Sequence, residues 1–169
     1  MKYVDRVLSV VAVVSWMVLI FWFSAKTAGT SSAMSGGLIE KIAGFFNSEF
    51  DTISAVERAE IVERLQWFVL KEAHFSEYAM LVLLVSNALR SFSIKNRVRL
   101  LSAPVISLVY AVSDEIHQYF VPGRACRFLD IAIDFGGAVC GAAVFFAAAW
   151  LLGKPVRRGR TDDKKADLE

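Results

Sequence analysis

The stretch that decides the fold is LLSAPVISLVYAVSDEIHQYFVPGRACRFLDIAIDFGGAVCGAAVFFAAAWLL, residues 100–152. It contains two long apolar runs, 100–121 and 128–152, on either side of a short polar turn with Pro122 and Gly123. Each run has about 20 residues or slightly more, which is enough for an α-helix to cross a hydrocarbon layer of roughly 30 Å. Proline and glycine directly after an apolar run end a helix sharply. The stretch therefore predicts two membrane-spanning helices joined by a tight turn.

Two further apolar runs lie nearer the N-terminus, over residues 7–23 and 71–90. The chain of 169 residues is 56% hydrophobic, with a mean hydropathy of +0.47, and soluble domains use roughly 45–50% apolar residues. This composition argues against a lone water-soluble domain, a disordered chain, a collagen or a disulfide scaffold. We therefore expect an all-α integral membrane protein, built as a four-transmembrane-helix bundle over residues 1–153 and followed by a polar tail, 154–169.

The first run, 7–23, has a rival interpretation as a cleaved signal peptide. It is longer than the usual apolar core of about 7–15 residues, and cleavage after Ala25 would place Phe23 where a small residue is required. We therefore favour an uncleaved span.

Basic residues outside the apolar runs predict the orientation. The two chain ends and the segment 90–99 hold 12 Lys and Arg residues, whereas the segment 24–71 and the turn 122–127 hold seven. Because Lys and Arg accumulate on the cytoplasmic side of membrane proteins, both termini are expected in the cytoplasm of a multi-pass protein of the cell membrane. The net charge of +2 is too small to indicate nucleic-acid binding.

The external insert, 24–70, is too long for a simple connector. Its first part, 24–37, is rich in Ser, Thr and Gly, which favours a loop. The segment 54–70 has amphipathic helical periodicity, and Ser54 and Glu57 have the spacing of a capping box. We expect an external amphipathic helix here, which either lies on the outer leaflet or, in the favoured interpretation, folds over the bundle as a lid.

Polar side chains of the last three apolar runs share a common depth. Both histidines and most acidic residues of these runs fall within about 11 Å of the predicted outer helix ends, at 1.5 Å per residue. The full set is Lys71, Glu72, His74, Glu77, Tyr78, Asp114, Glu115, His117, Gln118, Asp130 and Asp134. Because an uncompensated charge in hydrocarbon costs at least about 3 kcal/mol, we expect these residues to face one another or water around an outward-facing polar pocket.

One interpretation of this pocket is an anion site. Lys71, Arg124 and Arg127 would grip a phosphate or carboxylate, helped by the free N–H groups of two helix N-termini. His74 and His117 would add hydrogen bonds to the same anion.

The alternative interpretation is a polar network that only fixes the helix register. Lys71 would then pair with Glu77 or Asp114, and Arg124 with Asp130. The acidic residues outnumber the basic ones in this cluster, so mutual pairing alone would leave some carboxylates unpaired.

Small residues mark one face of the fourth apolar run. Gly137 and Gly141 form a ridge for close helix packing, which we expect within the bundle. A homo-oligomer that forms through the same two glycines is the other possibility.

Two signature stretches of this sequence resemble those of the VanZ-like membrane proteins. They are KEAHFSEYA, residues 71–79, and SDEIHQYFVPGRACRFLDIAIDFGGAVCG, residues 113–141, and FSAKT at 23–27, with Ser32 beyond it, is similar to a weaker motif of the same family. The resemblance implies a set of characteristic polar residues with Gly137, namely Lys71, His74, Glu77, Tyr78, Asp114, Glu115, His117, Gln118, Arg124, Asp130 and Gly137. It also implies a prokaryotic plasma membrane and a link to sensitivity to teicoplanin-type glycopeptides, without a defined activity. Glu72, Ala73 and Asp134 depart from the family pattern, and the external insert is longer than in minimal members.

Three kinds of function remain open. In the first, the pocket binds a membrane lipid or a lipid-linked cell-envelope precursor through Lys71, Glu77, Tyr78, Gln118, Arg124, Arg127, Asp130 and Asp134. In the second, the protein is a membrane enzyme with His117, Asp114, Glu115 and His74 as acid/base candidates. A metal version of this enzyme would use His74, His117, Asp130 and Asp134, but the sequence has neither an HExxH nor a CxxC motif. In the third, the protein is a ligand-free accessory protein. Apart from the metal version of the enzyme, the sequence leaves the cofactor unknown.

Overall fold

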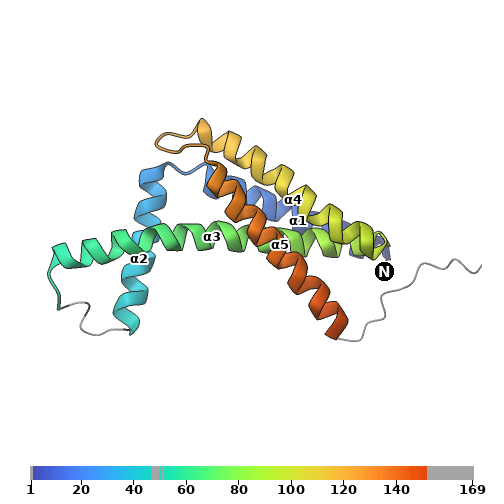
Figure 1. Ribbon diagram of the computed structural model, residues 1–169, viewed down its shortest axis with the longest axis horizontal. Helices are drawn as coiled ribbons and strands as arrows, with labels where there is room; N and C mark the ends of the chain where they lie inside the picture. The colour runs from blue at the N-terminus through green and yellow to red at the C-terminus, as the bar shows by residue number, and fades with distance from the viewer. Residues whose placement is uncertain (1, 47–49, 51, 152–169) are drawn as a thin grey trace, which may run out of the picture.

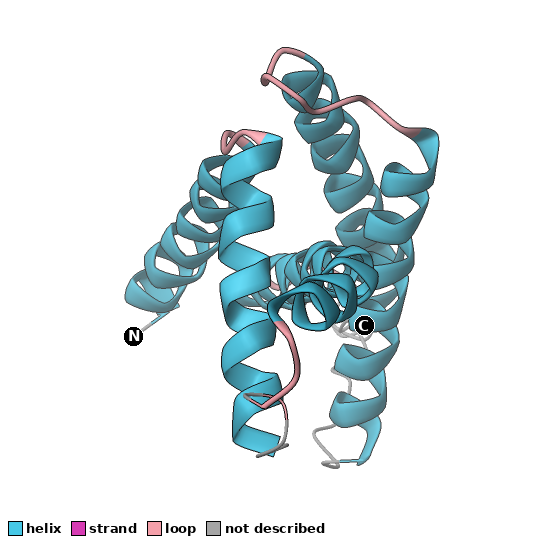
Figure 2. Cartoon of the chain, turned by 90° about the vertical axis from the view of Figure 1, so that its left-hand side faces the viewer, coloured by secondary structure: helices cyan, strands magenta, loops and turns pink. Residues whose placement is uncertain are grey.

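The computed structural model describes residues 2–46, 50 and 52–151, and five helices make up most of that part of the chain (Figure 1). They are α1 (Lys2–Ser24), α2 (Ala28–Phe46), α3 (Ala55–Ser91), α4 (Asn96–Tyr119) and α5 (Phe128–Leu151). Between them the described residues form only turns and loops (Figure 2), so the predicted all-α class is confirmed. The polar tail predicted over 154–169 lies outside the described residues.

Local sequence signals set two of the helix ends. Ser54 caps α3, because its Oγ accepts a hydrogen bond from the Glu57 N–H at 3.3 Å while the Glu57 carboxylate accepts one from the Ser54 N–H at 3.0 Å. Beyond α4, Gly123 has a φ of 77°, which residues with a Cβ rarely adopt. A Cβ at Gly123 would also lie 3.1 Å from the Cβ of Ala28. The turn after α4 therefore requires glycine both for its backbone conformation and for its contact with α2.

The loop predicted over 24–37 is wrong, because α2 begins at Ala28. Ser, Thr and Gly each lower helix propensity by only about 1 kcal/mol or less, so packing can override them. Here the small residues lie against α3, where a Cβ at Gly36 would be 3.4 Å from the Val62 side chain. Gln66 of α3 also donates hydrogen bonds to the Ser32 carbonyl and the Ser35 hydroxyl. The Ser- and Gly-rich segment is thus helical because it packs closely against α3.

The predicted lid is also wrong. The segment 54–70 and the predicted span 71–90 form one unbroken helix, α3, which has 37 residues and is about 55 Å long at 1.5 Å per residue. Its first half extends outward from the other helices, and α2 crosses it there (Figure 1). The stretch contains neither Gly nor Pro, and a change from polar to apolar composition does not interrupt a helix.

Hydrogen bonds at two places show that α1 runs antiparallel to α3 and parallel to α4. At one end, Arg6 Nε donates to the Ser91 carbonyl at 3.2 Å, and the Ser9 and Ser91 hydroxyls are 3.0 Å apart. At the other end, the Ala28 N–H donates to the Pro122 carbonyl at 3.4 Å. The start of α1 therefore lies beside the end of α3, and the end of α1 lies beside the end of α4.

Helices α3 and α5 approach each other so closely that their backbones touch. A Cβ at Gly137 would lie 2.9 Å from the carbonyl carbon of Phe75, and a Cβ at Gly141 would lie 2.9 Å from that of Ala79. The glycine ridge thus packs inside the bundle, as predicted. A homo-oligomer through the same ridge would have to displace α3 of its own chain.

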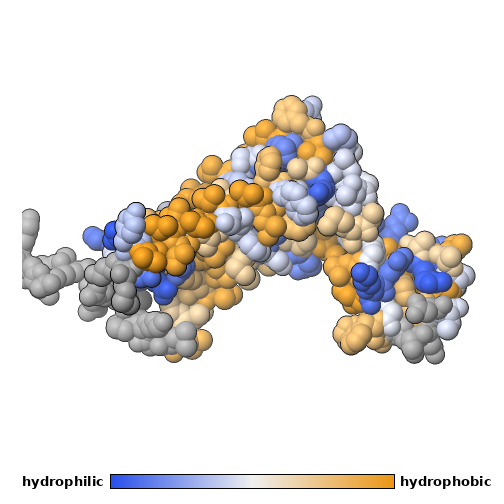
Figure 3. Space-filling view, turned by 180° about the vertical axis from the view of Figure 1, so that it is seen from behind, coloured by the Kyte–Doolittle hydropathy of each residue, from blue (hydrophilic) through white to orange (hydrophobic). Residues whose placement is uncertain are grey.

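The surface of α4 has the reverse polarity of a water-soluble helix. Its buried side chains include Arg99, Ser107, Asp114, Glu115 and Gln118. Its exposed side chains include Leu101, Val105, Val109 and Ile116. Seen from behind, hydrophobic side chains cover much of the face, and hydrophilic side chains gather at its two sides and near its top (Figure 3). A polar interior with an apolar exterior is the arrangement expected of helices surrounded by lipid.

Two of the helices are long and apolar enough by themselves to cross a membrane. They are Tyr3–Ser24 of α1, with a mean hydropathy of 2.4, and Phe128–Leu151 of α5, with 1.9. Helices α3 and α4 are not among them, and both carry charged residues at each end of their apolar runs. These findings and the composition together indicate a membrane protein.

Candidate functional site

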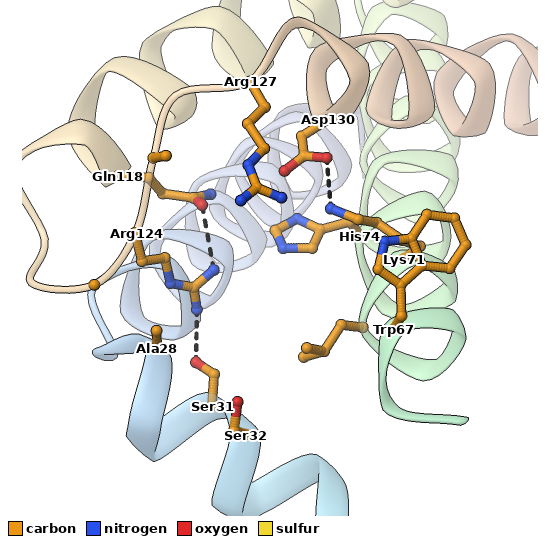
Figure 4. A pocket seen from close by; sticks show the side chains of 13 residues that line it. Ala28, Ser31, Ser32, Trp67, Lys71, His74, Gln118, Arg124, Arg127 and Asp130 are labelled. Carbon is orange, nitrogen blue, oxygen red and sulfur yellow. Dashed lines mark hydrogen bonds and ion pairs between the residues drawn. The ribbon is translucent and has the colours of Figure 1, made fainter. Parts of the chain in front are cut away.

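A cavity of about 190 Å³ opens where α2, α3 and the α4–α5 turn meet. Its polar side chains point toward one another from these elements (Figure 4). The lining consists of Ala28, Ser31, Ser32, Trp67, Leu70, Lys71, His74, Gln118, Gly123, Arg124, Ala125, Arg127 and Asp130. Three of these side chains are cations and one is a carboxylate, so the cavity is predominantly positive.

Lys71 and Asp130 form an ion pair at one side of the cavity. Lys71 Nζ lies 2.5 Å from Asp130 Oδ1, and the two side chains are only 17% and 14% exposed. Asp130 lies in the first turn of α5, where the helix dipole stabilises a carboxylate. The predicted pairing of Lys71 with Glu77 or Asp114 is therefore wrong, as is the pairing of Arg124 with Asp130.

Arg124 joins three elements through its guanidinium. Its Nε donates to the Lys26 carbonyl at 3.0 Å, and one Nη donates to the Gln118 side-chain oxygen at 3.2 Å. The other Nη donates to the Ser31 hydroxyl at 2.6 Å and to the Phe23 carbonyl at 3.5 Å. A planar fork of donors suits this division of bonds, so Arg124 holds the end of α1, the start of α2 and the end of α4 together.

Arg127 uses its backbone and its side chain differently. Its N–H donates to Glu115 Oε2 at 3.0 Å, and its carbonyl accepts from the Asp130 N–H at 3.0 Å at the start of α5. Its side chain is exposed and points into the cavity beside Arg124 and His74 (Figure 4). Within residues 2–46, 50 and 52–151, nothing forms a hydrogen bond or an ion pair with this guanidinium. The cavity therefore contains one cation whose donors are free.

A buried network lies directly behind the cavity. Asp114 Oδ2 accepts hydrogen bonds from the Ser24 hydroxyl at 2.7 Å and from Gln118 Nε2 at 3.0 Å. All three side chains are almost completely buried. Gln118 thus connects Asp114 to Arg124, and the network links the end of α1 to the end of α4.

His74 lies between the cavity and two further carboxylates, the buried Asp134 and the partly buried Glu77. Its Nδ1 lies 3.7 Å from Asp134 Oδ1 and 4.0 Å from Glu77 Oε2. Asp134 and Tyr78 are fully buried, and neither the Asp134 oxygens nor the Tyr78 hydroxyl has a hydrogen-bond partner among the described residues. Buried polar groups without hydrogen-bond partners lower stability, so these side chains are a cost to the fold.

A family model described as VanZ/LLP1 matches residues 9–151, most of the chain. The chain belongs to the VanZ/LLP1 family. No curated protein and no solved structure matches this chain. Family membership agrees with the resemblance in the two signature stretches, whose residues line the cavity and the network behind it.

This VanZ/LLP1 protein places its two histidines in different surroundings. The His117 ring stacks on Phe21 of α1, with ring centroids 4.3 Å apart, and it does not line the cavity. Glu115, two residues earlier, is fully buried and accepts the Arg127 N–H with one oxygen. Of the four acid/base candidates, His74 is therefore the one that reaches the cavity.

No metal centre is evident in the described part of this VanZ/LLP1 protein, where no three His, Cys, Asp or Glu side chains are grouped to hold an ion. The four metal ligands considered from the sequence are divided, since His117 faces α1 whereas His74 and Asp134 lie between α3 and α5.

Sequence reasoning missed several side chains of the site. Ser31 and Trp67 line the cavity and were not singled out, whereas Ser24, which bonds to Asp114, and Ser32, which lines the cavity, were noted only as part of the weaker family motif. The available signal was the run of Ser and Thr residues directly after the first apolar run. Such residues next to a cluster of charges supply hydroxyl partners.

Proposed function

We propose that this VanZ/LLP1 protein binds the anionic headgroup of a membrane lipid or a lipid-linked cell-envelope precursor in the cationic cavity. Through that binding it affects sensitivity to teicoplanin-type glycopeptides. The first part of the proposal is supported by the chemistry of the cavity, and the second by the family resemblance alone.

The observation that carries the proposal is the free guanidinium of Arg127. Arg124 is already engaged by four acceptors, and Lys71 is paired with Asp130. Since Asp130 is the one carboxylate in the lining and is already paired, the Arg127 charge is not neutralised within the cavity. A phosphate or carboxylate that entered would meet this fork of donors with Lys71 and His74 beside it.

The proposal includes four membrane spans with both termini in the cytoplasm, which places the cavity at the outer surface. It is supported by the reverse polarity of α4 and by the lengths of α1, α4, α5 and the second half of α3. It is also supported by the basic residues Arg6, Arg90, Lys95, Arg97 and Arg99 at the end opposite the cavity.

The orientation can be tested with the cysteines. Cys126 is an exposed thiol in the α4–α5 turn, whereas Cys140 lies on α5 within the apolar span. A membrane-impermeant maleimide should label intact cells at Cys126, and Cys126→Ser should abolish that labelling. Labelling that required permeabilised cells would overturn the orientation.

The binding proposal can be tested by native mass spectrometry from mixed micelles that contain equal amounts of phosphatidylglycerol and phosphatidylcholine. The wild type should retain phosphatidylglycerol preferentially, and Arg127→Ala should lose that preference. Arg97→Ala is the matched control, because Arg97 is also an exposed arginine but lies on the first turn of α4, far from the cavity. Equal retention of the two lipids by the wild type, or an undiminished preference in Arg127→Ala, would refute the proposal.

The glycopeptide part needs a cellular readout. Expression of the wild type in a glycopeptide-sensitive bacterium should raise the inhibitory concentration of teicoplanin, and Arg127→Ala at equal expression should not. An equal increase with both proteins would show that resistance does not depend on the cavity.

A second candidate function is a membrane enzyme, and the 3.7 Å approach of Asp134 to His74 Nδ1 favours it. The His74 ring lines the cavity, as a general acid/base group must, and Asp134 lies near its Nδ1 without a hydrogen bond between them. Incubation with the retained lipid should then change the mass of that lipid, and His74→Gln should stop the change without loss of binding. An unchanged lipid mass after incubation with the wild type would refute the enzyme function and leave lipid binding as the proposed function.

A further inference from the structure

A second, mainly apolar cavity adjoins the cationic one. It has a volume of about 240 Å³ and lies between α2 and α3 at the end of α1. Its apolar lining is Phe23, Met34, Leu38, Val69, Leu70 and Ala73. We call this space the apolar groove.

The apolar groove and the cationic cavity share four lining residues, Ser31, Leu70, His74 and Arg124. The two spaces are therefore neighbours with a common wall, and they differ in chemistry. Glu77, the carboxylate that lines the groove, lies 4.0 Å from His74 at this common wall. Met34 and Leu38, on α2, are about half exposed, so the opposite side of the groove opens onto an apolar surface.

We propose that the groove holds one hydrocarbon chain of the same ligand whose anionic group occupies the cationic cavity, so that the ligand is a lipid phosphate with a single chain between α2 and α3. This inference rests on the proposed anion site and adds the chain, its route between α2 and α3, and the residues that would contact it. An amphiphile is the one occupant that matches both halves, because a free phosphate leaves the groove empty and a neutral lipid leaves Arg127 unpaired. A volume of about 240 Å³ is below the range of roughly 300–1,000 Å³ of pockets for drug-sized molecules, which suits one chain rather than two.

The groove depends on the helical structure of α2. A loop over this segment would not present Ser31, Met34, Ser35 and Leu38 on one side, three or four residues apart. As a helix crossing α3, the segment places the hydroxyl of Ser31 toward Arg124 and the two apolar side chains farther along the groove.

The test compares dodecyl phosphate with inorganic phosphate, titrated calorimetrically into the full-length protein in one neutral detergent. Ala73→Phe fills the groove from an exposed helical position, and Ala59→Phe makes the same change on α3 away from both cavities. Dodecyl phosphate partitions into the micelles to the same extent with every variant. The ratios of the apparent dissociation constants between variants therefore measure binding to the protein.

We expect Ala73→Phe to weaken dodecyl phosphate binding at least tenfold and to leave inorganic phosphate binding unchanged, which also shows that the variant is folded. Ala59→Phe should resemble the wild type, and Arg127→Ala should lose both ligands. If Ala73→Phe binds dodecyl phosphate as Ala59→Phe does while Arg127→Ala does not, the groove proposal is refuted and the anion site stands. If Arg127→Ala binds both ligands as the wild type does, the anion site itself is refuted. If the wild type binds both ligands equally well, the anion comes from free phosphate and the chain contributes nothing.

Discussion

Replacement of Gly137 by alanine adds one methyl group where α5 touches the backbone of α3. The new Cβ would lie 2.9 Å from the carbonyl carbon and 3.1 Å from the Cα of Phe75. Both are backbone atoms, so no side chain can rotate away to make room. Overpacking of a filled site costs about 1–3 kcal/mol, and contact with backbone belongs at the upper end. Since Gly→Ala inside a helix otherwise gains about 0.5–1 kcal/mol, the free energy of unfolding should fall by about 2 kcal/mol.

The adjacent Gly136 provides a matched control. A Cβ there would lie 3.7 Å from Cε2 of the Phe75 ring, an ordinary van der Waals contact. Gly136→Ala should therefore be neutral or stabilise the protein by up to about 1 kcal/mol. Both variants can be unfolded by SDS titration from neutral-detergent micelles, with tryptophan fluorescence and helical circular dichroism as probes. Equal stability of the two variants would refute the close approach of α3 and α5, whereas loss of an oligomer at unchanged stability would assign Gly137 to a contact between copies.

Three further perturbations follow from the contacts of the site and of α3. A double-mutant cycle with Lys71→Ala and Asp130→Ala should give a coupling of about 1–3 kcal/mol in the same titration, because the pair is largely buried, and a coupling near zero would contradict the ion pair. Arg124→Lys should lower the free energy of unfolding by about 2 kcal/mol, since one ammonium cannot reach acceptors on three elements. Wild-type stability of this variant would contradict the role of Arg124 in holding the three elements together. Hydrogen bonds from Ser54 lower the pKa of Glu57. The cap therefore stabilises the first turn of α3 at every pH above about 4.3, the usual glutamate pKa. This stabilisation is lost as the pH falls through the lowered pKa of Glu57. The rate of amide hydrogen exchange in the first turn of α3, corrected for its intrinsic pH dependence, should increase on acidification. In Ser54→Ala the same amides should exchange fast at neutral pH as well. A corrected exchange rate that does not change with pH in the wild type would show that the cap contributes nothing.

The helices of the bundle could be predicted from the sequence because each rests on a strong local signal. The apolar runs 7–23, 100–121 and 128–152 correspond to α1, α4 and α5, within a few residues at each end. The gathering of the polar side chains of three helices at one depth was also predictable, since topology and helical periodicity together leave few places for charges in lipid.

The insert and the choice of partners could not be predicted in the same way. The helix α2 depends on a long-range contact between Gly36 and α3, which no local propensity encodes. Spacing along one helix places Lys71 within reach of several carboxylates and does not say that Asp130, on another helix, is the nearest. Likewise, both histidines had suitable depth, but only the rotation of α4 about its axis turns His117 toward Phe21.

The close packing of α3 and α5 and the polar cluster at their outer ends depend on each other. Asp134, Gly137 and Gly141 lie three or four residues apart on one face of α5, and all three are buried. Opposite them on α3 lie His74, directly before the Phe75 backbone that Gly137 contacts, and Ala79. A side chain at position 137 would push the two backbones apart and move Asp134 away from His74, with only one helical turn between the two positions. The glycines therefore also position the chemistry, so Gly137→Ala should weaken ligand binding through His74 as well as lower stability, whereas a mutation that only destabilised the fold would leave the affinity of the remaining folded protein unchanged.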